Sequence, residues 1–342
     1  MAIQTYDTHT LAGVIEGFDQ FTPFLLDRFF PMAVTFDTSF IDFDVLETDY
    51  RIAPFVSPVQ AGQVMKALGG TTKKFTPAYV KPKGIVDPEK VLTRRAGEAI
   101  GGSLSPAARR DAIIADLLNS QRKQITRTWE WMAAQALLTG KVVVSGENYP
   151  EAEVDFGRAA GNTKALTGTA RWSQSGVDPL ADLEGWFGEL EAPATDVVMS
   201  ADAWALFYAK VKGDWKDLAD ITIAGNTAII NVAPGNGQWV QWKGRVGNVN
   251  YWVYTGMYKD AAGATQLYIP SEELIIGSAA VEGHRCFGAI QDANVGYMPG
   301  EIVPRNWVNE DPGVEYVMSQ SAPLMVPARP NASMRVKVNA AA

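Results

Sequence analysis

The sequence predicts an α+β protein in which an N-terminal arm and a long extended hairpin precede one long helix. Residues 40–56 alternate polar and apolar side chains, as a strand does. Residues 54–88 are rich in proline and glycine, which disfavour a helix. Residues 107–139 contain neither of these residues, and their apolar side chains recur mostly at steps of three or four, as in an amphipathic helix.

The composition of the 342-residue chain suits two domains, or one domain with large extensions. Hydrophobic residues make up 47%, which is ample material for a core. The 10 Trp, 11 Tyr and 14 Phe exceed the needs of one small core, so we expect some of them at subunit contacts, where aromatic residues are enriched.

Charge and cysteine content narrow the classes of function. The formal net charge of -8 and the scattered short basic groups argue against a surface that grips nucleic acid. Cys286 is the only cysteine, which excludes an internal disulfide and fits a reducing cytoplasm. The N-terminus does not resemble a signal peptide, and no apolar run reaches the length of a membrane span.

The N-terminal segment has few structural signals. Its one apolar patch, Phe21 to Phe30, is bracketed by Pro23 and Pro31. A patch of this size is too short to form its own core. We therefore expect residues 1–39 to be an arm that lies against another surface.

Residues 40–95 are expected to form an extended loop with flanking strands. The pair Gly69-Gly70 lies between two extended runs, which predicts a chain reversal there. An isolated hairpin is marginally stable in water. We therefore expect residues 50–90 to form a protruding ribbon that lies on a neighbouring molecule.

The long helix is predicted over residues 106–139. Ser105 is a good N-cap, and Pro106 suits the first helical position. Gly140 follows as a C-cap residue does. At 1.5 Å per residue this helix would be about 50 Å long.

The remainder of the chain mixes short helices, strands and loops. Residues 161–176 are rich in glycine, threonine and serine and are predicted to be a loop. The segments with a periodic or capped pattern are a hairpin at 141–160, helices starting at Pro179 and Ala201, and strands at 196–199, 228–232, 239–242, 249–254, 266–269 and 334–338.

Candidate catalytic residues are few. His284 and Cys286 lie two apart, so they would share one face of a strand, as a metal pair or as a base and its nucleophile would. Two groups do not complete either kind of site. The sequence also lacks the glycine-rich phosphate-binding motifs, the serine elbow and zinc-ligand spacings. We expect no catalytic residue, cofactor or metal.

Several sequence blocks resemble the lambda-like major capsid proteins, the E-protein family of tailed bacteriophages. The blocks follow the family's order and span nearly the whole chain. They are Phe55-Val-Ser-Pro-Val, Leu68-Gly-Gly-Thr-Thr, Phe75-Thr-Pro-Ala-Tyr-Val-Lys-Pro-Lys, Gly288-Ala-Ile-Gln-Asp-Ala, Arg305-Asn-Trp and Ser319-Gln-Ser-Ala-Pro-Leu-Met.

This resemblance implies the capsid fold of phage Hong Kong 97. In that fold an arm and an extended loop accompany a peripheral domain with a spine helix and an axial domain. The implied division is 1–39 arm, 40–95 extended loop, 96–177 peripheral domain with spine helix 106–139, 178–283 axial domain, and 284–342 return to the peripheral domain with the C-terminal strands.

The resemblance also implies a function. The chain would assemble with itself into pentamers and hexamers of an icosahedral shell that encloses double-stranded DNA without reading its sequence. Scaffold and portal proteins, and in some members a decoration protein, would be its partners in the bacterial cytoplasm. Because residues 60–80 have little core of their own, we also expect that their deletion leaves a soluble subunit that cannot form shells. The alternatives are another virion component, such as a decoration or tail-tube protein, and a hydrolase that uses Cys286.

On this interpretation the extended loop carries the contacts between subunits. The expected contact residues are Phe55, Val59, Met65, Leu68, Lys73, Lys74, Phe75, Tyr79, Lys81 and Lys83.

Overall fold

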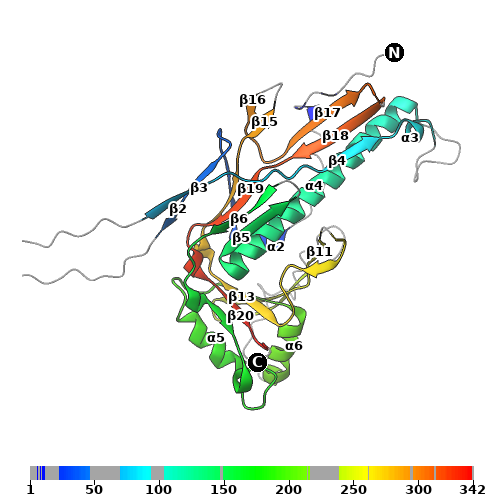
Figure 1. Ribbon diagram of the computed structural model, residues 1–342. Helices are drawn as coiled ribbons and strands as arrows, with labels where there is room; N and C mark the ends of the chain where they lie inside the picture. Colours follow the sequence, from blue (N-terminus) through cyan, green and yellow to red (C-terminus); the bar gives the residue numbers. More distant parts are fainter. Residues whose placement is uncertain are drawn as a thin grey trace, which may run out of the picture.

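The structure is a computed structural model. It describes residues 23–46, 70–93, 104–146, 149–213, 239–260, 262–292, 296–311 and 313–340, with Tyr6, Thr8, Thr10, Leu11 and Trp215. The body is elongated, with a long helix running through its upper part, a sheet and two short helices below, and one hairpin projecting sideways (Figure 1).

The long helix α4 spans Pro106–Thr139, as predicted. The Ser105 hydroxyl accepts a hydrogen bond from the Ala108 N–H at 3.2 Å, which caps the first turn. Gly140 ends the helix in the left-handed conformation, with φ 68°, and its N–H donates to the Ala136 carbonyl. Both predicted caps are confirmed.

The lower part of the body is built on a six-stranded sheet with the order β7-β20-β13-β8-β10-β9. The pairs β7–β20 and β8–β10 are parallel, and the other neighbours are antiparallel. The strands are β7 Thr163–Ala165, β20 Ser333–Lys337, β13 Glu273–Gly277, β8 Asp196–Met199, β10 Val249–Tyr254 and β9 Val240–Val246.

Both faces of this sheet are covered. Val197 and Met199 of β8 belong to one apolar cluster with residues of helices α5 (Pro179–Phe187) and α6 (Ala201–Val211). Val198, which points the other way, belongs to the main core with residues of α4. Every residue of β8 is buried for this reason.

Smaller sheets and hairpins surround α4. The sheet β17-β18-β4 packs on its N-terminal half, where the Gln121 side-chain amide donates to the Val317 carbonyl at 2.9 Å. The other elements are the helices α2 Phe24–Phe29 and α3 Pro88–Leu92, the strands β1 Met32–Thr35, β14 Gly283–Phe287, β19 Pro323–Pro327, β17 Val303–Asn309, β18 Val314–Gln320 and β4 Lys83–Val86, and the hairpins β2 Ile41–Leu46/β3 Gly70–Phe75, β5 Lys141–Gly146/β6 Tyr149–Asp155, β11 Met257–Lys259/β12 Thr265–Leu267 and β15 Ile290–Asp292/β16 Gly296–Met298.

The predicted turn at Gly69-Gly70 is wrong. Gly70 is the first residue of strand β3 and pairs with Leu46 of β2. The two legs of the projecting hairpin are therefore residues 41–46 and 70–75, and residues 47–69 between them lie outside the described part of the chain.

One further expectation needs correction. Residues 161–176, expected as loop, contain strand β7, because its backbone pairs with the distant C-terminal strand β20. The described end of the predicted arm lies against the body of its own chain: α2 packs on α4, and β1 pairs in parallel with β14. The short strand predicted at 228–232 falls outside the described residues.

Candidate functional site

The β2–β3 hairpin leaves the body at its base and extends away from it (Figure 1). Alternation along β2 explains how the base is fixed. Ile41 and Phe43 are buried, and the Phe43 ring lies 5.7 Å from that of Phe156. Asp42 and Asp44 face solvent. The inner face of the hairpin thus belongs to the core, while its outer face is free of the body.

Three of the expected contact residues lie on β3. The Lys73 ammonium donates to the Asp155 carbonyl of β6 at 2.5 Å. The Lys74 ammonium lies 3.2 Å from the centre of the Phe40 ring, a cation–π contact on the exposed face. Phe75 is half-buried and packs against the main core. Each of these side chains therefore has a partner within its own chain.

Three others follow the hairpin and run along the body. The Tyr79 hydroxyl accepts from the Gln291 N–H at 3.2 Å. Lys81 lies 4.5 Å from the Tyr79 ring centre, and Lys83 lies 4.2 Å from that of Tyr316. Burial, with Arg305 nearby, lowers the pKa of Lys81.

The predicted ribbon 50–90 is therefore too long at its C-terminal end, because residues 79–86 are part of the body. The backbones of Val80 and Ser321 exchange two hydrogen bonds, and β4 pairs with β18. Phe55, Val59, Met65 and Leu68 fall outside the described residues, and the contacts of all ten residues with a neighbour stay a prediction.

A groove of about 1600 Å³ runs beside α4, between the residues that follow the hairpin and the β5–β6 and β11–β12 hairpins. Aromatic side chains from separate elements line it: Tyr79, Trp131, Tyr149, Trp239 and Tyr258. An open surface rich in aromatic groups has the character of an interface core.

The candidate nucleophile is poorly placed for catalysis. Cys286 is 4% exposed, and burial raises the pKa of its thiol to about 12. The thiolate, which is the reactive form, is therefore scarce at neutral pH. Among the described residues no cluster of three metal-ligating side chains occurs. No helix in the same part of the chain is long and apolar enough to cross a membrane.

Sequence reasoning missed two of the buried carboxylates, those that contact helix α2. Glu130 is fully buried in α4, and Asp196 is 1% exposed at the start of β8. Both receive hydrogen bonds from helix α2. A signal was present for Glu130, because it follows Trp129 at the margin of the apolar stripe of the long helix.

Two solved structures are similar to this chain over nearly its full length. A putative capsid protein of a prophage of Escherichia coli CFT073 superposes with a TM-score of 0.79 at 27% identity, covering 98% of this chain and 100% of that chain. A phage-related protein from Bordetella bronchiseptica RB50 has a TM-score of 0.55 at 14% identity, and that likeness concerns the fold alone. The fold is of the Hong Kong 97 type, and the class is that of virion shell proteins.

The sequence relatives define the family. The family description "Phage major capsid protein E" matches residues 7–338. The major capsid protein of Escherichia phage lambda is 32% identical over 97% of this chain and 99% of its own length. That of Escherichia phage N15 is 32% identical over 98% of this chain and 100% of its own length. The chain therefore belongs to the phage major capsid protein E family.

This membership establishes the general function. The chain is a major capsid protein of a tailed bacteriophage, a self-assembling structural subunit of the virion capsid. The prediction made from the sequence blocks is confirmed.

Proposed function

We propose that residues 47–69, with the outer part of β2–β3, form a loop that lies across a neighbouring copy, and that this contact drives assembly. The observation that carries this proposal is the form of the hairpin. Within the described residues β2 and β3 make a sheet of two strands, and only the base is buried. Such a pair is marginally stable in water, so a surface on a neighbour would stabilise it.

Contacts of this kind are head-to-tail, because one surface of the subunit meets a different surface of its neighbour. Head-to-tail contacts close into rings when the rotation between copies permits it. Pentamers and hexamers of an icosahedral shell are the proposed rings. The aromatic groove beside α4 is large enough to contribute to such an interface.

We also propose the partners of the subunit and the compartment in which it assembles. The shell encloses double-stranded DNA without sequence-specific binding, and the net charge of -8 limits adhesion of the shell wall to phosphates. Scaffold and portal proteins, and a decoration protein in some members, act during assembly in the host cytoplasm. The subunit has no enzymatic role, which is consistent with the buried, protonated Cys286.

The proposal is tested by removing residues 47–69 without disturbing the body. Because Val80 bonds to Ser321 in the body, deletion of residues 60–80 would also damage the fold. The sharper variant deletes residues 47–69 and joins Leu46 to Gly70 through an Asn-Gly turn, which suits a tight hairpin. We expect a folded, soluble subunit that does not form shells in electron micrographs.

A control replaces residues 47–69 by a glycine-serine linker of the same length. If the loop acts through its side chains, this variant also fails to assemble while its circular dichroism matches the original chain. Normal shells from either variant would refute the proposal.

A further inference from the structure

The short helix α2 lies between α4 and the six-stranded sheet. Its Phe24 ring is 5.1 Å from that of Trp252 and 5.9 Å from that of Tyr254, both on β10. Leu25 and Leu26 are fully buried. Pro23 at its N-cap provides no side-chain acceptor, so the first N–H groups of α2 need partners from elsewhere.

Glu130 of α4 supplies these partners. Its carboxylate accepts from the Leu25 and Leu26 N–H groups, each at 2.9 Å, and from the Tyr254 hydroxyl at 2.8 Å. One buried carboxylate thus links α4, α2 and β10. The three groups that donate to it are neutral, so the hydrogen bonds stabilise the anion without cancelling its charge.

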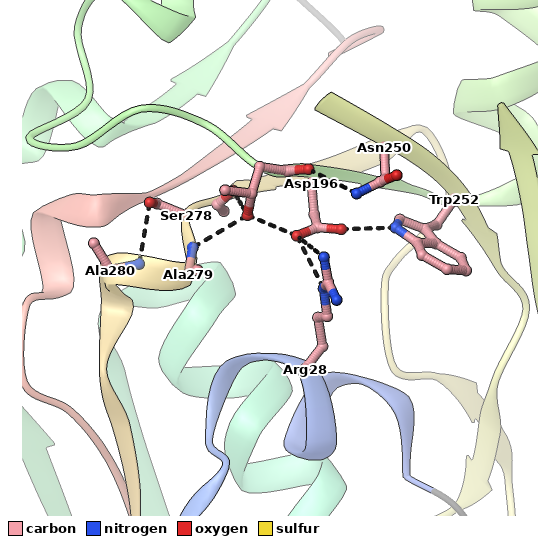
Figure 2. Close-up of polar contacts among 9 residues, drawn as sticks. Arg28, Asp196, Asn250, Trp252, Ser278, Ala279 and Ala280 are labelled. Carbon is pink, nitrogen blue, oxygen red and sulfur yellow. Dashed lines mark hydrogen bonds and ion pairs between the residues drawn. The ribbon is translucent and has the colours of Figure 1, made fainter. Parts of the chain in front are cut away.

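Asp196 holds the other end of α2. Its carboxylate accepts from Arg28 Nε at 3.0 Å and from Trp252 Nε1 at 2.8 Å. The Thr195 hydroxyl donates to the same carboxylate at 2.7 Å. Figure 2 shows Arg28 reaching from α2 to this carboxylate, which lies at the start of strand β8. Unlike Glu130, Asp196 is paired with a cation.

The two carboxylates therefore fasten one helix to both parts of the body. We propose that α2 is a proton-linked clasp: when docked it holds the six-stranded sheet against α4, and protonation of Glu130 favours the docked position. The reason is that undocking would give Glu130 back to water, where its charge costs little, whereas docking buries it.

The direction of the pH effect follows from the environment of Glu130. Burial raises its pKa from 4.5 to about 7, and Asp27 on α2 adds to this, while the three hydrogen bonds oppose it. A carboxyl whose pKa is raised in the docked state binds more protons there than when exposed. Docking is therefore favoured in acid and weakens as pH rises from 4.5 to 7.

The surrounding ionisable groups come from several elements. Asp27 pairs with Arg285 of β14 at 2.6 Å. Burial raises the pKa of Tyr254, of Tyr268, and of Cys286, so these three stay neutral between pH 5 and 8. Arg28 and Asp196 form an ion pair at the other end of α2. Arg127 lies on α4, and its backbone carbonyl accepts a hydrogen bond from the Tyr268 hydroxyl. His284 lies on β14.

Hydrogen exchange of the full-length chain tests the clasp. The measure is the protection factor of peptides covering residues 24–30, which corrects for the intrinsic dependence of exchange on pH. With pKa values of about 7 docked and 4.5 exposed, linkage predicts that this protection falls about 70-fold between pH 5 and pH 8. In Glu130→Gln the fall is expected to disappear.

Two matched variants separate this role from general loosening. Asp196→Asn weakens the other end of the clasp, so it lowers protection at every pH but retains the fall. His284→Gln removes the histidine of β14, and we expect this variant also to show the fall in protection between pH 5 and pH 8. A fall that persists in Glu130→Gln, or protection in the original chain that is constant between pH 5 and 8, would overturn the proposal.

Discussion

Two glycines allow the N-terminal segment to approach the sheets closely. A Cβ atom on Gly277 of β13 would overlap the Phe29 ring, and one on Gly283 of β14 would overlap the Phe29 carbonyl oxygen. A ring can move, whereas a backbone carbonyl in a packed core cannot move without shifting the helix. Gly283 is therefore the more restrictive position.

We expect Gly283→Ala to lower the free energy of unfolding by about 2–3 kcal/mol, because overpacking a core costs of that order. Denaturant unfolding monitored by tryptophan fluorescence measures this. Gly161→Ala is the control, since nothing lies within 4 Å of the added methyl group, and its effect should be within about 0.5 kcal/mol. Equal stability of the two variants would contradict the packing described for Phe29.

At the residue scale, the sequence predicted the positions governed by local rules. Ser105 and Gly140 act as caps, and their roles depend on neighbours within a few residues. Glu130 depends on Leu25 and Tyr254, which are 105 and 124 residues away along the chain. No local pattern encodes contacts over such separations, so its role required the structure.

At the scale of elements, the projecting hairpin is anchored by one face of β2. We expect Phe43→Ala to lower the free energy of unfolding by about 3–4 kcal/mol, because it leaves a cavity against Phe156. Asp42→Ala, on the exposed face of the same strand, should change it by less than about 0.5 kcal/mol. Chemical denaturation compares the two, and a Phe43→Ala chain as stable as the Asp42→Ala chain would show that the base is not anchored.

Elements with strong local signals were predicted best. Helix α4 matches the predicted residues 106–139, and α5, α6, β8 and β10 begin within a residue of the expected positions. Strand β7 was missed because its three residues gain order only by pairing with β20, about 170 residues later. The Gly69-Gly70 turn was misplaced because a glycine also fits a strand, and only the pairing with Leu46 reveals this.

At the scale of the whole molecule, the sequence blocks identified the family, and the comparisons confirm it over nearly the full chain. The order of arm, hairpin and long helix also followed from the residues alone. The six-stranded sheet did not, because its order joins strands from five separate segments of the chain. The assignment of residues to peripheral and axial domains stays a prediction.

Electron cryomicroscopy of particles formed by the overexpressed protein shows whether residues 47–69 of one copy lie on the surface of another. We expect closed icosahedral shells in which density for these residues leaves the β2–β3 hairpin and crosses a neighbouring subunit. Shells in which the same residues fold back on their own body, or assemblies that are tubes, would contradict it.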